Sequence, residues 1–184
     1  MDDFVSTDVS IKTQKNELLA KSYLKSISNF LKELKNDKML VYVLKVIRTK
    51  LIKLFYAVQP VYRKLVETTI SLFGGDSVSM NVKLEVLLLL LNFVKNADGP
   101  LREKIIKKCY MEFSKSSKTV NWRNWEIVNF TKNGIIELMT IDTEISYVII
   151  FSIIQKWAKT LKGLQKKVKK DTVSALYNWG TINS

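Results

Sequence analysis

Residues 86–94 read VLLLLLNFV and form the most apolar run of this 184-residue chain. The run falls well short of the roughly 20 residues that a bilayer-spanning helix needs. It therefore predicts a helix buried in a protein core. The chain is 47% apolar, which is enough for a globular fold, and contains only six Gly and two Pro. This composition favours α-helix throughout.

On the N-terminal side of this run, apolar residues recur at steps of three and four, which is typical of helices with one apolar face. We predict a helix from Leu18 to Leu34, a second from Leu40 to Phe55 and a third from Pro60 to Phe73. Asn36-Asp37 supplies a turn and an N-cap between the first two. Gly74-Gly75 is expected to end the third in the left-handed conformation.

On the C-terminal side, the same periodicity continues. Asp76 or Ser77 is expected to cap the helix of the leucine run, and Asp98-Gly99-Pro100 to separate it from the next. Further helices are predicted over residues 101–113, 127–139 and 145–161, the last capped by Asp142, with a short one near 171–177. A polar loop covers residues 114–121.

The predicted fold is all-α, with antiparallel helical hairpins stacked as a HEAT/armadillo-like α-solenoid. Because no motif recurs along the chain, a compact helical bundle remains the alternative. Residues 1–15 are expected to be a flexible leader and residues 16–184 a single α-helical repeat domain. The leader carries acids where a secretory signal needs positive charge.

Histidine is absent and cysteine occurs once, at Cys109. This excludes His-based acid–base catalysis, Ser-His and Cys-His nucleophile pairs, and zinc sites built from His and Cys. No intramolecular disulfide can form, which fits a reducing compartment. Cys109 is expected to be a small core residue. We therefore expect no enzyme activity, no cofactor or metal and no small-molecule substrate.

The strongest functional signal is the run Lys156–Lys170, KWAKTLKGLQKKVKK, in a chain of formal net charge +13. It contains seven lysines and no acid: Lys156, Lys159, Lys162, Lys166, Lys167, Lys169 and Lys170. Such a cluster indicates contact with nucleic-acid phosphates, or with an acidic protein partner, because lysines displace counterions from polyanions. A merely solvated face and an amphipathic membrane helix are weaker interpretations.

Four tryptophans could stack on unpaired bases, although large aromatics at helical spacing are more often core residues. Trp157 lies on the apolar face of its predicted helix and is expected to be buried. Trp122 follows the polar loop and is the candidate for an exposed aromatic contact.

From about residue 16 to 182, the order of these features resembles the nucleolar complex protein 2 family of ribosome-assembly factors. The similarity is carried by Phe130–Leu138, by Asp142–Tyr147, by Phe151–Leu161 and by the lysine run followed by Ala175–Trp179. Tyr177-Asn178-Trp179 after the lysines is its most specific part. The chain departs from the family at residues 154–156, Ile-Gln-Lys, where an Arg-Gln pair and a histidine are usual.

This resemblance implies a non-enzymatic helical scaffold in large (60S) ribosomal subunit biogenesis, located in the nucleus and nucleolus. It also implies a heterodimer with sister nucleolar complex proteins, and contacts with pre-60S ribosomal proteins and rRNA. Family members are much longer, so the sequence is that of a reduced homologue or of a fragment. Tyr177, Asn178 and Trp179 are expected to be structural, packing the last short helix. The alternative function is a protein–protein adaptor without a nucleic-acid role.

Overall fold

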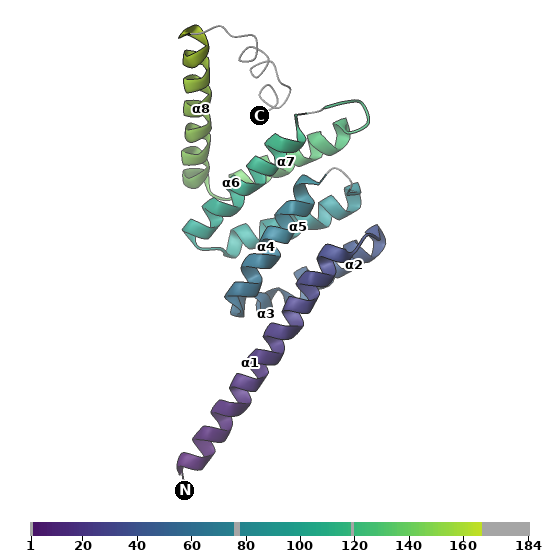
Figure 1. Cartoon of the computed structure of the whole chain (residues 1–184), viewed down its shortest axis with the longest axis vertical. Helices are drawn as coiled ribbons and strands as arrows, with labels where there is room; N and C mark the ends of the chain where they lie inside the picture. The colour runs from purple at the N-terminus through teal and green to yellow at the C-terminus, as the bar shows by residue number, and fades with distance from the viewer. Residues whose placement is uncertain (1, 76–77, 119, 167–184) are drawn as a thin grey trace. The chain divides into compact units, whose positions relative to one another are not determined.

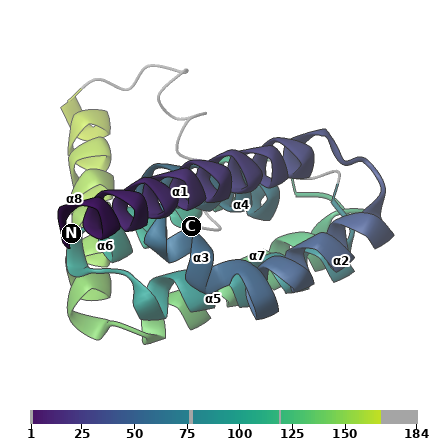
Figure 2. The same ribbon diagram turned by 90° about the horizontal axis from the view of Figure 1, so that it is seen from below.

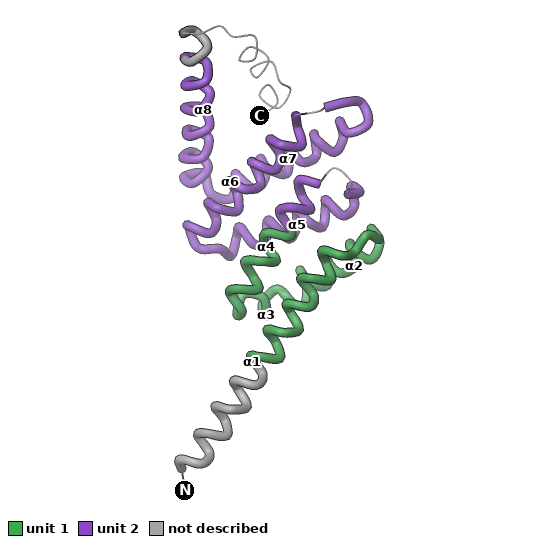
Figure 3. Tube along the Cα trace, in the orientation of Figure 1, with its two compact units in different colours: residues 1–68 green, residues 69–184 purple. Residues whose placement is uncertain are grey.

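The computed structural model describes residues 2–75, 78–118 and 120–166, and the side chains of residues 17–75, 78–118 and 120–162. Within these ranges the chain is helical and contains no strand, which confirms the all-α prediction (Figure 1). It divides into two compact units, residues 1–68 and 69–184 (Figure 3). Whether the helices form a solenoid or a bundle stays a prediction.

The first unit contains α1 (Asp2–Glu33), α2 (Asp37–Val46), the π-helix η1 (Ile47–Leu51), α3 (Ile52–Ala57) and the beginning of α4 (Gln59–Gly74). α1 begins at Asp2, within the stretch that the sequence assigned to a flexible leader. Asn36 caps α2 as predicted, because its Oδ1 accepts hydrogen bonds from the backbone N–H groups of Lys38 and Met39 at 3.0 and 3.3 Å.

The single helix predicted over residues 40–55 is interrupted by a π-helical turn. The buried residues of this stretch include Ile47 and Ile52, which are five positions apart. In a regular α-helix that step would carry Ile52 away from the buried side. The wider π turn brings it back, as π-bulges do within α-helices. After this change of register, Leu54 is exposed although it is apolar.

The second unit contains the end of α4, then α5 (Met80–Asn96), α6 (Gly99–Ser116), α7 (Trp125–Thr140) and α8 (Thr143–Lys166). α5 contacts α6 and α7, while α8 contacts α6 and α7. The leucine run lies on α5, where Val86, Leu87, Leu89, Leu90 and Phe93 are buried. The interpretation of this run as a core helix is confirmed.

The expected left-handed stop at Gly74-Gly75 is wrong, because no described glycine has a positive φ. Gly74 instead ends α4 where α6 approaches closely. A Cβ atom on Gly74 would lie 2.7 Å from Cβ of Glu112. Gly134 of α7 is similar, since its Cβ would lie 3.1 Å from side-chain atoms of Leu87 and Phe73. These glycines allow close packing of helices rather than an unusual backbone conformation.

Candidate interaction surface

The first turn of α8 is held by Asp142, which the sequence predicted as a cap. Its Oδ1 accepts a hydrogen bond from the backbone N–H of Ile145 at 3.1 Å. Its Oδ2 accepts one from Nη1 of Arg102, on α6, at 2.6 Å. These hydrogen bonds lower the pKa of Asp142 from its ordinary value of 3.8, and the bond from Ile145 contributes more than the bond from Arg102.

Arg102 also binds the end of the preceding helix. Its Nε donates to the carbonyl oxygen of Val94 at 2.9 Å, and its Nη2 to that of Ala97 at 3.0 Å. The guanidinium therefore satisfies carbonyls at the C-terminal end of α5 and pairs with the cap of α8. Sequence reasoning missed Arg102, because its partners lie on other helices and leave no local spacing to recognise.

Only the beginning of α8 is buried against the rest of the unit. Ser146 and Ile149 are buried, and Oγ of Ser146 donates to the carbonyl oxygen of Met139 at 2.7 Å. After Ile149, no side chain of α8 up to Lys162 is buried. Figures 1 and 2 show the helix extending away from α6 and α7 toward its C-terminal end.

Three of the seven predicted binding lysines have described side chains. Lys156, Lys159 and Lys162 are all exposed on α8, and we call them the lysine face. None of them forms an ion pair with a described acid. The side chain of Lys166 lies outside the described residues, as do Lys167, Lys169, Lys170, Tyr177, Asn178 and Trp179. The proposed roles of these residues stay predictions.

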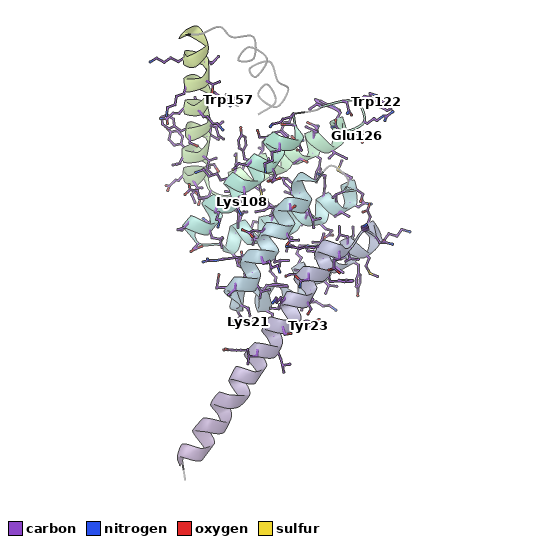
Figure 4. The ribbon with its side chains drawn as sticks, in the orientation of Figure 1. Lys21, Tyr23, Lys108, Trp122, Glu126 and Trp157 are labelled. Carbon is purple, nitrogen blue, oxygen red and sulfur yellow. The ribbon has the colours of Figure 1, made fainter. Side chains whose placement is uncertain are left out.

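A second feature of α8 is a row of large apolar side chains, all of which are exposed except Trp157. It consists of Tyr147, Ile150, Phe151, Ile154, Trp157 and Leu161, and we call it the apolar stripe. Trp157 is only partly buried, so the expectation that it belongs to the core is wrong; Figure 4 shows it on the projecting helix. Sequence reasoning missed the stripe, although apolar residues on more than one side of α8 were a signal for it.

Trp122 lies in the connection between α6 and α7 and is 83% exposed (Figure 4). The guanidinium of Arg123 lies 5.1 Å from the centre of its ring. The turn is fixed by two asparagines: Oδ1 of Asn121 accepts from the N–H of Arg123, and Oδ1 of Asn124 accepts from the N–H of Asn121. The aromatic face is thus held at the surface, where a planar ligand could stack on it.

The described residues also include Cys109, which is fully buried in α6. Burial, with a smaller contribution from Glu112, raises the pKa of its thiol to about 12, so it is protonated and unreactive at neutral pH. Among the residues that the structure describes, no group of His, Cys, Asp and Glu side chains could hold a metal ion. In the same part of the chain, every helix is too short or too polar to cross a membrane.

Residues 100–184 match the model of the Noc2p family. The match runs through α6, α7 and α8, and so includes the lysine face and the apolar stripe. This C-terminal part of the chain is similar to the Noc2p family. The resemblance seen in its sequence is thereby confirmed.

Individual proteins are similar to the chain over longer stretches. Nucleolar complex protein 2 of Drosophila melanogaster is 27% identical over 103 residues, which are 56% of this chain and 13% of that protein. A NOC2 family protein of Schizosaccharomyces pombe is 23% identical over 181 residues, 98% of this chain and 25% of that protein. The nucleolar complex protein 2 homologue of Caenorhabditis briggsae is 25% identical over 167 residues, 90% of this chain and 23% of that protein. The chain thus spans a quarter or less of the length of these relatives.

α8 therefore combines two unlike surfaces. The lysine face offers positive charge, and the apolar stripe offers surface that the described part of the chain leaves uncovered. Such a helix is suited to binding rather than to catalysis.

Proposed function

We propose that this chain is a non-enzymatic helical scaffold in large (60S) ribosomal subunit biogenesis, acting in the nucleus and nucleolus. The observation that carries the proposal is the Noc2p match over residues 100–184, together with relatives named as nucleolar complex proteins. In this role the chain forms a heterodimer with a sister nucleolar complex protein and contacts pre-60S ribosomal proteins and rRNA.

The lysine face is the proposed contact with rRNA phosphate, continued by Lys166, Lys167, Lys169 and Lys170. Lys156, Lys159 and Lys162 are exposed and lie at steps of three along one side of α8. A phosphate backbone that approaches this side meets three ammonium groups within two helical turns. Trp122 is the proposed aromatic contact for an unpaired base, since it is exposed and beside Arg123.

The direct test is affinity purification of the tagged chain from its own cells, with the accompanying proteins and RNA identified. We expect pre-60S particles and a sister nucleolar complex protein. Recovery of cytoplasmic partners without pre-rRNA would overturn the ribosomal role and favour the alternative, a protein–protein adaptor whose lysines only maintain solubility.

The lysine face is tested by changing Lys156, Lys159 and Lys162 together to alanine and measuring affinity for single-stranded RNA at several salt concentrations. We expect the slope of log affinity against log salt to fall by about 0.7 for each lost phosphate contact. The matched control changes Lys95, Lys104 and Lys132 to alanine, three exposed lysines of the same unit with the same total charge. If the two variants show equal slopes of log affinity against log salt, the lysine face does not contact phosphate.

A further inference from the structure

The apolar stripe has the spacing of a helix–helix seam. Tyr147, Ile154 and Leu161 are seven residues apart, and Ile150 and Trp157 are also seven apart and fall between them. This alternation of three and four residues is the heptad pattern that packs the side chains of one helix between those of another. The spacing therefore favours an α-helix as the occupant.

Most of the stripe is exposed, and Trp157 is partly buried. Tyr147 is 68% exposed, Ile154 53% and Leu161 51%. The ring of Tyr147 stacks on that of Phe151, with centroids 6.1 Å apart, which extends the apolar surface along the helix. Apolar side chains gathered in one continuous row, rather than scattered singly, mark a binding surface.

The charge of α8 selects among possible helical occupants. From Ile145 to Lys162 the helix carries three lysines and no acid. Lys162 follows Phe151 by eleven residues, which is close to three full turns, so it lies at the border of the apolar stripe. A second copy of this chain would bring the same lysines and another net charge of +13. An acidic helix would bring the opposite charge, which favours its association.

We propose that the apolar stripe binds an amphipathic α-helix of a partner protein that carries Asp and Glu beside its apolar face. The proposal deepens the scaffold function and rests on it only for the source of the partner. The occupied stripe would leave Lys156 and Lys159 on another side of α8, so that one helix binds protein and phosphate together.

The probe is a fluorescent synthetic helix about three heptads long, with Leu and Ile at the seam positions and Glu on both flanks. Its binding to the full chain is measured by fluorescence anisotropy, beside a second probe that has Lys in place of every Glu. We expect the acidic helix to bind and the basic helix to bind at least about tenfold more weakly.

The stripe is located by the variant Ile154→Glu, which we expect to weaken binding of the acidic helix at least about tenfold, since it places a carboxylate in the seam. The matched control is Ile136→Glu on α7, because Ile136 is also 53% exposed and the charge change is the same. Circular dichroism establishes that both variants keep the helicity of the unchanged chain. Equal loss of binding in both variants would overturn the proposal.

Two other occupants give different results. If the chain's own C-terminal segment covers the stripe, the acidic helix binds only after Tyr177 and Trp179 are both changed to alanine. If a second copy covers it, sedimentation shows a dimer that Ile154→Glu dissociates. Either result overturns the proposal of a partner helix. The proposal is also overturned if neither the unchanged chain nor any variant binds the acidic helix. These outcomes do not depend on recovery of pre-60S particles, so the two proposals fail separately.

Discussion

Gly74 illustrates how single residues set the packing of the second unit. It ends α4 at a point where α6 is so close that a Cβ would meet Cβ of Glu112 at 2.7 Å. The atom that it would meet is the first atom of the Glu112 side chain, fixed to the backbone, rather than the flexible end, so relief requires movement of a helix. The glycine pair was visible in the sequence, but its reason was not, because Glu112 is far along the chain.

We expect Gly74→Ala to destabilise the folded chain by about 1–2 kcal/mol, since overpacking outweighs the better helix propensity of alanine. The control is Gly99→Ala, where a new Cβ would meet nothing within 4 Å and stability should change by about 0.5 kcal/mol or less. Urea denaturation of both variants measures the difference. Equal stability of the two variants would show that α4 and α6 can separate at no cost.

Asp142 predicts how the stability of the folded chain depends on pH. Its pKa is lower in the folded chain than its ordinary value of 3.8, so its contribution to stability is complete above that value and is lost as pH falls through the folded pKa. Asp142→Asn should therefore be less stable than the unchanged chain at neutral pH, with the difference shrinking in acid. Asp98→Asn is the control, because the side chain of Asp98 makes no cap hydrogen bond. Thermal melts of both variants and of the unchanged chain, from neutral pH to about pH 3, measure whether the stability difference shrinks in acid for Asp142→Asn but not for Asp98→Asn.

At the scale of elements, a lysine on α5 binds the end of α4. Nζ of Lys83 is buried and donates to the carbonyl oxygen of Phe73 at 2.7 Å. This carbonyl is among the last of its helix, which have no partner within the helix itself. The leucine run identified α5 as buried, but the pattern did not indicate that a lysine within the same helix is buried too.

Replacing this residue by Lys83→Met keeps an unbranched side chain of similar length and removes the ammonium group. We expect a loss of about 1–3 kcal/mol, because the carbonyl of Phe73 loses its hydrogen bond inside the protein. Lys95→Met on the same helix is the control, since Lys95 is exposed and its replacement should change stability by about 0.5 kcal/mol or less. Similar losses in both variants would contradict the assignment.

Most helix limits followed from local signals. Asn36 caps α2, Pro100 stands in the first turn of α6 and Asp142 caps α8, and each acts on neighbours in the sequence. The π turn at Ile47–Leu51 and the exposure of Ile154 were not predicted. Both depend on where other helices lie, and periodicity alone cannot tell an apolar side that is covered from one that is open.

At the scale of the whole molecule, the division at Thr68 falls inside α4, where no Gly, Pro or polar linker marks it. Sequence reasoning finds domain boundaries by such linkers, so it predicts one repeat domain over residues 16–184, and this assignment stays a prediction. The resemblance to the Noc2p family, by contrast, was accessible from the sequence, because Tyr177-Asn178-Trp179 after the lysine run is a local pattern.

The second unit contains the only cysteine of the chain, which offers a probe of its unfolding. Because Cys109 is buried and its pKa is raised to about 12, we expect a thiol reagent at pH 8 to modify it only as the unit opens. The labelling rate should rise with denaturant together with the loss of helicity. Rapid, complete labelling without denaturant would show that α6 is accessible in the native state.

The bonds of Asp142 and Arg102 have a mechanical consequence. They hold the first turn of α8, and no side chain from Ile150 to Lys162 is buried, so a change of direction at this pair would move the far part of the helix. With a rise of about 1.5 Å per residue, its 24 residues extend about 36 Å, and a tilt of about 10° at the base would swing the far end by about 6 Å. The position of a partner bound near Leu161 therefore depends on Asp142 and Arg102, which lie far from the point of contact.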